Sequence, residues 1–146
     1  MKITFKGDYA LKTVLDLALN HNRNLSKIPD MARRLDIPRK FLEQILLELK
    51  KGGFVNSKRG KEGGFYLAKD PSSIKLGDVI RFIDGPIEPI GCVRASYKGC
   101  RDIHHCVFKK IWCKTTKALL DIVDRITFED LVQDVTAGKA ALSYSI

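Results

Sequence analysis

The sequence predicts a mainly α-helical protein with one small β wing, and two patterns support that prediction. Apolar residues recur at three- and four-residue spacing in several stretches, which is the period of amphipathic helices. Only residues 54–57 and 64–67 have the pattern of strands, and they flank a charged, glycine-rich loop. With 146 residues, 45% of them hydrophobic and 29% charged, the composition is that of a folded domain rather than a disordered chain.

Three helices are expected in the first 52 residues. Residues 8–20 place apolar side chains at i, i+3, i+4, i+7 and i+8. A short second helix follows Ser26, whose hydroxyl can cap it. Residues 36–38, Asp-Ile-Pro, break the chain before a third helix that ends at the glycine pair 52–53. A short helix, a tight turn and a longer helix in this order are typical of a helix-turn-helix.

The predicted hairpin follows the third helix directly. Its tip, residues 58–63, reads Lys-Arg-Gly-Lys-Glu-Gly, which is too charged and too rich in glycine for a core. A fourth helix is expected to start at Ser72 or Ser73 and to stop at residues 84–86, Asp-Gly-Pro. Because a basic-tipped hairpin after a helix-turn-helix is a wing, residues 1–84 are predicted to form a winged helix-turn-helix domain.

The second half of the chain has a different organisation. Residues 85–106, hereafter the cysteine loop, show no periodicity, and a loop of that length usually serves a function. A long helix is expected over residues 106–126, with more apolar surface than a small domain covers. A second copy of the chain is the natural cover, so residues 107–134 are predicted to hold a dimerisation helix and a short terminal helix. Residues 135–146 are expected to form a tail. The apolar stripe comprises Phe108, Ile111, Ala118, Ile122 and Ile126.

The charge distribution indicates a polyanionic partner for the first half. Residues 1–70 carry 15 Lys and Arg against 8 Asp and Glu, whereas residues 71–146 carry 11 against 9. A solvated basic surface without a partner is the alternative that charge alone leaves open. Asp8, Lys12 and Asp16 interrupt the apolar N-terminal stretch, which argues against a signal peptide or a membrane span. We therefore expect a cytoplasmic protein.

The third helix and the hairpin tip carry side chains suited to double-stranded DNA. Gln44 can pair with adenine, Glu43 can accept from cytosine, and an arginine can pair with guanine. Arg59 at the tip suits a narrow minor groove, where the negative potential favours guanidinium. The alternative is a solvated helix face and a polar hairpin tip. The predicted DNA-binding residues are Arg39, Lys40, Glu43, Gln44, Lys50, Lys51, Lys58, Arg59 and Gly60.

All four cysteines lie in one part of the chain, at positions 92, 100, 106 and 113. In a reducing cytosol, grouped cysteines are more often metal-binding or redox-active than structural disulfides. Cys113 follows Cys106 by seven residues, which in a continuous helix separates them by about 10 Å at a rise of ~1.5 Å per residue. That is too far for one small cluster, so Cys113 is expected in the helix packing. Zinc is disfavoured because no closely spaced cysteine pair exists, and a disulfide switch in the loop stays open.

These features resemble the Rrf family of winged-helix regulators, the group that contains IscR, NsrR, RirA and CymR. The likeness covers the chain to about residue 135. It implies a dimeric bacterial transcription factor, often with an iron–sulfur cluster, [2Fe–2S] or [4Fe–4S], in the loop after the wing. The motifs are residues 1–11, Phe41-Leu42-Glu43-Gln44, Arg59-Gly60 followed by Gly63-Gly64-Phe65, and the cysteine loop ahead of Trp112.

The resemblance implies that Cys92, Cys100 and Cys106 are the three thiolate ligands, and it leaves the fourth ligand open. Lys109 stands where IscR-like members carry a histidine, and a protonated lysine is not a ligand; His104 and His105 could substitute. Asp8 matches the aspartate that NsrR-like members supply from the partner subunit, although it also stands where an N-cap of the first helix belongs. Seven residues separate the first two cysteines where the family usually has five.

The sequence therefore predicts a homodimeric DNA-binding regulator, a repressor or dual regulator. Its operator binding would be controlled by an iron–sulfur cluster that senses iron–sulfur or iron status, nitric oxide or redox state. The alternative is a cluster-free, CymR-like regulator that responds to a partner protein or to thiol oxidation. An enzyme is disfavoured, because the sequence has no C-x-x-C motif, phosphate-binding loop or Ser/His/Asp set.

Overall fold

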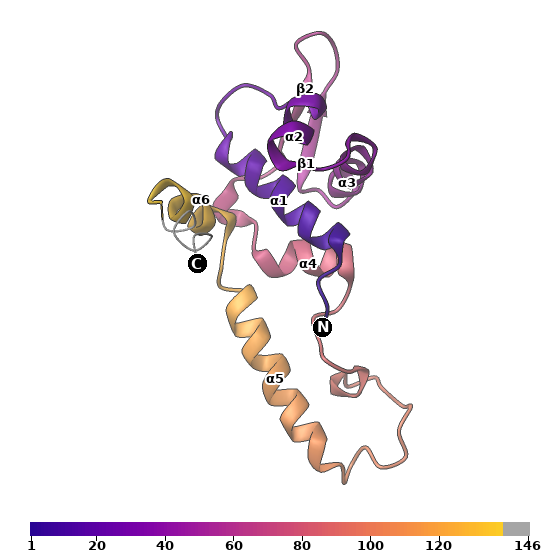
Figure 1. The fold of residues 1–146 in the computed structure, drawn as a ribbon. Coiled ribbons are helices and arrows are strands. Elements are labelled where there is room, and N and C mark those ends of the chain that lie inside the picture. The colour runs from indigo at the N-terminus through magenta and orange to yellow at the C-terminus, as the bar shows by residue number, and fades with distance from the viewer. Residues whose placement is uncertain (139–146) are drawn as a thin grey trace.

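The computed structural model describes residues 1–138 and confirms a mainly helical fold with one two-stranded antiparallel sheet. Figure 1 shows α1 to α4, the hairpin and α6 gathered in one part, while α5 extends away from it. The predicted tail lies outside the described residues from position 139 onward. The elements are α1 (Phe5–Leu19), α2 (Ile28–Leu35), α3 (Arg39–Lys51), β1 (Val55–Lys58), β2 (Gly64–Leu67), the 3₁₀ turn η1 (Pro71–Ser73), α4 (Leu76–Asp84), the 3₁₀ turn η2 (Gly91–Val93), α5 (Val107–Val123) and α6 (Phe128–Thr136).

One apolar core joins α1, α2, α3, the hairpin, α4 and α6. Its fully buried members come from every one of these elements, and α6 contributes Phe128, which is 0% exposed. Burying one such large apolar side chain stabilises the fold by about 1.5–3 kcal/mol. The core also includes Val14, Met31, Leu42, Ile45, Leu46, Leu49, Val55 and Val79.

The first helix begins earlier than expected, and its cap is Thr4 rather than Asp8. Thr4 Oγ1 accepts from the backbone N–H of Gly7 at 3.0 Å. Thr4 also donates twice to the Asp84 carboxylate, from its N–H at 3.0 Å and from its hydroxyl at 2.5 Å. The absence of a side chain at Gly7 leaves room for this carboxylate, because a Cβ there would displace it. The start of α1 is thereby tied to the end of α4.

Three other helix boundaries differ from the predicted ones. Ser26 does not cap α2; its backbone pairs with Phe65 of β2, at 3.0 and 2.8 Å, and so adds a bridge beside the hairpin. Residues 71–73 form the 3₁₀ turn η1, whose cap is Asp70, so α4 starts at Leu76. The fifth helix is also shorter than predicted, since it ends at Val123.

The last turn of α5 is attached to the main part by a second apolar cluster and an ion pair. Ile80 of α4, Ile87 of the cysteine loop and Val123 of α5 are buried together. Beside them, Arg81 Nη2 lies 2.6 Å from Asp124 Oδ2, and this hydrogen bond raises the pKa of Arg81. Within residues 1–138, no helix has both the length and the apolar character needed to cross a bilayer.

Candidate nucleic-acid interface and cysteine loop

The third helix buries one stripe and exposes the opposite one. Leu42, Ile45, Leu46 and Leu49 are each 0% exposed and face the core. Because the helix repeats every 3.6 residues, the residues between them must point outward. The structure places all six predicted α3 residues on this outer face, which are Arg39, Lys40, Glu43, Gln44, Lys50 and Lys51.

Two contacts fix α3 relative to its neighbours. Lys50 Nζ donates to Ser57 Oγ of β1 at 2.7 Å, which ties the end of α3 to the wing. Lys6 Nζ of α1 lies 2.7 Å from Glu48 Oε2 at the other side of α3. Both pairs are solvent-exposed, so they orient the helix more than they stabilise it.

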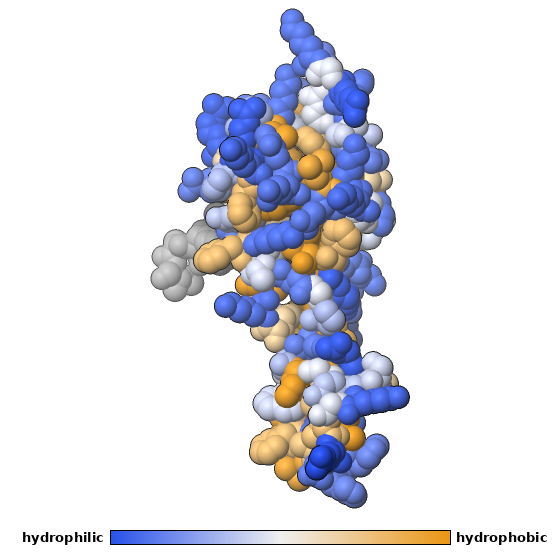
Figure 2. Space-filling model, turned by 90° about the vertical axis from the view of Figure 1, so that its right-hand side faces the viewer, coloured by the Kyte–Doolittle hydropathy of each residue, from blue (hydrophilic) through white to orange (hydrophobic). Residues whose placement is uncertain are grey.

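The wing presents its basic tip away from the core. β1 and β2 pair antiparallel from Val55↔Leu67 to Lys58↔Gly64. Gly60 has φ 109°, a conformation that L-residues rarely adopt, so glycine is required at the tip. Lys58 and Arg59 are exposed beside it, and the wing forms the hydrophilic upper end of the molecule in Figure 2.

Two apolar residues of α3, Phe41 and Leu47, are exposed rather than buried. The position of Phe41, four residues before Ile45, predicts an inward side chain, but it is 43% exposed and packs edge-on against Tyr9, with ring centroids 5.9 Å apart. Leu47 is 57% exposed on the outer face. The signal for Leu47 was available, since it falls between the positions of the buried stripe.

The three predicted cysteine ligands sit at separate points of the cysteine loop. Cys92 lies in η2 and is half-buried, Cys100 is exposed, and Cys106 is the N-cap of α5. All are free thiols, a donor set that suits an iron–sulfur cluster. Over the described part of the chain, however, no three Cys, His, Asp or Glu residues gather as a metal site. The chemistry of the donors fits a cluster, and binding one would require the loop to bring them together.

The prediction that Cys113 is buried in helix packing is wrong. Cys113 is exposed, and together with Cys106, His104 and Lys109 it lines an open cleft of about 460 Å³. The helix between the two cysteines is continuous from Val107, so the predicted spacing of two helical turns holds.

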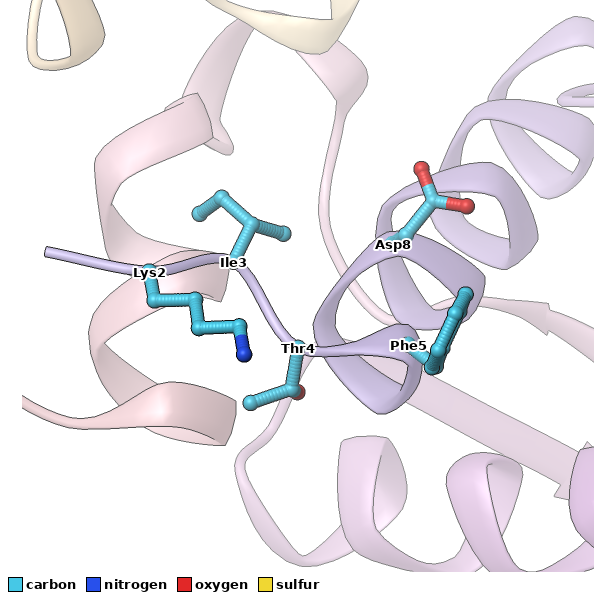
Figure 3. A pocket seen from close by; sticks show the side chains of 5 residues that line it. All are labelled: Lys2, Ile3, Thr4, Phe5 and Asp8. Carbon is cyan, nitrogen blue, oxygen red and sulfur yellow. The ribbon is translucent and has the colours of Figure 1, made fainter.

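Asp8 is not the N-cap of α1, which was the alternative to its predicted role as a cluster ligand. Its side chain is half-exposed in the first turn of α1 and forms an ion pair with Lys12 at 2.6 Å. Figure 3 shows Asp8 and Phe5 on this first turn, lining an open cleft of about 610 Å³. Phe5 is 83% exposed, an unusual state for a phenylalanine.

The outer stripe of α5 is apolar and uncovered. Of its 17 residues only Val123 is buried. Phe108, Ile111 and Ile122 are 59%, 52% and 58% exposed, and Ala118 is exposed between them. These positions follow the a/d spacing of helices that pair. Figure 2 shows apolar residues among hydrophilic ones at this lower end of the molecule.

Comparisons with known proteins agree with this architecture. The sequence profile of the Rrf2 family, described as iron-dependent transcriptional regulators, matches residues 3–134. An rrf2-like HTH-type transcriptional regulator of Rhodobacter capsulatus is 39% identical over 137 residues, with 89% of this chain and 91% of the relative covered.

Two solved structures of regulators have the same fold. CymR, the global cysteine regulator of B. subtilis, superposes with a TM-score of 0.76 at 30% identity, over 91% of this chain and 97% of CymR. IscR of T. potens superposes with a TM-score of 0.72 at 30% identity, over 92% and 88%. The predictions of a winged-helix fold and of a regulator rather than an enzyme are confirmed. This chain belongs to the Rrf2 family of transcriptional regulators.

Proposed function

We propose that the protein is a homodimeric, cytoplasmic repressor or dual regulator whose operator binding is controlled by an iron–sulfur cluster. The observation that carries this proposal is the position of three free thiols on the loop that joins α4 to the exposed helix α5. The family's description as iron-dependent supports iron as the metal. In this proposal residues 1–84 read DNA, residues 85–106 sense, and α5 dimerises, while α6 packs into the core of the reading region.

The dimer follows from the stripe on α5. Among the described residues, 1–138, none covers the four apolar positions at heptad spacing, because α5 extends away from the main part (Figure 1). A second α5 offers the same stripe and would cover it. Two α3 helices related by a two-fold axis would then face half-sites about one DNA turn apart.

The DNA contacts divide between α3 and the wing. Glu43 and Gln44 would reach base edges, while Lys50, Lys51 and Lys58 would contact phosphates. Arg39 forms a long, solvent-exposed ion pair with Glu43 at 3.8 Å, and such a pair costs little to break, so the guanidinium would be able to turn toward DNA. Arg59 beside Gly60 would enter the minor groove.

Cys92, Cys100 and Cys106 would hold the cluster, with Asp8 of the partner subunit as fourth ligand. The bound cluster would supply a centre that reacts with nitric oxide, oxygen or reductants. The half-exposed carboxylate of Asp8 supports this role. Asp8 is not the N-cap of α1, so the backbone of α1 does not occupy its carboxylate as it would that of a capping residue. An oxygen ligand would leave the cluster more labile than a fourth thiolate.

A chain of contacts connects the cysteine loop with α3. Asp84, where the loop begins, accepts both hydrogen bonds from Thr4 at the start of α1. Two residues into that helix, Lys6 pairs with Glu48 of α3. A rearrangement of the loop that moves Asp84 would therefore tilt α1. Through the Lys6–Glu48 pair it would also change the spacing of the two α3 helices.

A second candidate is a cluster-free regulator, similar to CymR, that responds to a partner protein or to thiol oxidation. Two observations favour it: the loop thiols are not gathered, and Cys106 and Cys113 open into one cleft. Iron content separates the candidates, because this alternative predicts none.

Anaerobic purification followed by iron and sulfide analysis tests the first proposal. Wild-type protein should be coloured and carry both iron and sulfide, and Cys92→Ala should lose them. Cys113→Ala is the matched control, a cysteine outside the proposed ligand set, and should retain both. Asp8→Ala should bind a cluster that decays faster in air. A colourless wild-type protein after anaerobic reconstitution would leave the cluster-free candidate.

A further inference from the structure

Leu47 occupies the centre of the outer face of α3, where every neighbour is polar. At about 100° per residue, the four buried leucine and isoleucine residues of α3 define one direction, and Leu47 lies within roughly 30° of the opposite direction. Lys40, two turns before Leu47, and Lys51, about one turn after it, lie on the same line along the helix. Leu47 is 57% exposed, whereas Leu46 beside it is 0% exposed.

The neighbours of Leu47 are the residues proposed to read bases. Glu43 and Gln44 precede it by four and three positions, so their side chains adjoin it on the helix surface. Arg39 pairs loosely with Glu43, and Glu43, Gln44, Lys50 and Lys51 around Leu47 are all exposed. An apolar side chain in this place would meet whatever surface α3 approaches.

In the major groove only one base presents an apolar group. The C5-methyl of thymine lies on the groove floor beside the O4 acceptor, and apolar side chains contact it. A polar residue at position 47 would form hydrogen bonds with base edges there. Leucine can contribute binding free energy only through an apolar contact that shields the thymine methyl and its own methyl groups from water. The neighbouring lysines hold the phosphates on either side and so bring the face to the groove.

We propose that Leu47 reads the 5-methyl group of a thymine in each operator half-site and is a specificity-determining residue. The inference rests on the proposed function, in which α3 enters the major groove. It adds a base preference that the hydrogen-bonding residues Glu43 and Gln44 do not supply.

The experiment uses full-length protein and a duplex selected from random DNA by the wild type. Each thymine of the half-site is replaced in turn by uracil, which removes only the methyl group. Wild-type affinity should fall about fourfold at one thymine per half-site, the effect of one methyl-sized apolar contact. Leu47→Ala should bind the uracil and thymine duplexes equally at that position, and Leu47→Met should keep the difference.

Two controls separate this inference from the proposed function. Gln44→Ala should weaken binding yet keep the response to uracil at the Leu47 position. If no thymine shows a response that depends on residue 47 while Gln44→Ala still weakens binding, the assignment of Leu47 is wrong and α3 remains the reading helix. If Leu47→Ala and Gln44→Ala both leave affinity and sequence preference unchanged, the reading role of α3 fails as well.

Discussion

Helices α3 and α5 are both amphipathic, but among residues 1–138 only the apolar stripe of α3 is covered by other elements. α3 buries its whole apolar stripe against α1, α2 and the hairpin, and leaves one leucine outside. α5 is longer, yet a single residue, Val123, is buried. Within the described residues, the proposed DNA-reading region therefore buries its apolar surface in one chain, whereas α5, next to the cysteine loop, does not.

An incomplete region is suited to regulation. Its conformation depends on what covers it, because few internal contacts oppose a change. The complete region can then be displaced as one body without unfolding. Specific contacts join the two: the apolar cluster of Ile80, Ile87 and Val123, the ion pair of Arg81 with Asp124, and the hydrogen bonds from Thr4 to Asp84 at the start of the loop.

The largest expected effect tests the completeness of the reading region. Leu46→Ala should lower the free energy of unfolding by about 3 kcal/mol, because it leaves a cavity in a fully buried core. Ile111→Ala, at an α5 position that is 52% exposed, should cost under roughly 0.5 kcal/mol at concentrations where the protein is monomeric. Urea unfolding measures both. Equal losses would mean that α5 has a core of its own.

The second effect concerns association. Ile122→Asp should raise the dissociation constant of the dimer by about a hundredfold, since a carboxylate from each chain would be buried without a partner. Sedimentation equilibrium measures the change. Lys110→Asp, an exposed position off the apolar stripe, is the control and should dimerise nearly as the wild type does. If Ile122→Asp dimerises equally well, the stripe is not the interface.

A smaller effect is expected at the wing. Arg59→Ala should weaken specific DNA binding by about tenfold and relax the preference for A·T steps, because guanidinium insertion favours a narrow minor groove. Each Lys→Ala at a phosphate contact should instead reduce the slope of log binding constant against log salt concentration by about one. Fluorescence titrations at several salt concentrations distinguish these outcomes. An unchanged footprint and affinity would remove Arg59 from the interface.

The smallest effect concerns α6, which belongs to the reading region although it follows α5. Thr127 and Asp130 form a capping box, and Thr127→Ala should cost about 1 kcal/mol. The backbone N–H of Thr127 and then its side chain lower the pKa of Asp130. A folded pKa below the unfolded value of roughly 4 means that this stabilisation is present above that pH and is lost as pH falls below it. Unfolding measured from neutral to acidic pH should show a weaker loss in Asp130→Asn; an identical pH profile would exclude this contribution.

The sequence was sufficient to predict the helices, the wing and the exposed stripe of α5, because each depends on local periodicity. It was not sufficient to identify Thr4 as the N-cap of α1, because Thr4 is held partly by Asp84, a residue 80 positions away. Phe41 fits the inward stripe by spacing alone, but its ring turns to Tyr9. Cys113 was predicted to be buried because the sequence of a helix does not reveal how much of its surface other elements cover, and little of α5 is covered.

The residues of the candidate site also divide into those that local periodicity predicts and those that it does not. The outward residues of α3 follow from helix geometry, so sequence reasoning placed them where the structure does. The meeting of Cys92, Cys100, Cys106 and Asp8 depends on a bound cluster and a second chain, and neither a single sequence nor a single chain determines it. Those positions stay predictions.

The most direct test of cluster control is the affinity of one protein preparation for its selected operator, before and after iron is removed anaerobically with a chelator. The cluster-controlled account predicts a change of about tenfold or more in the dissociation constant, in either direction, and none in Cys92→Ala. Equal affinities of the iron-loaded and iron-free wild type would contradict it.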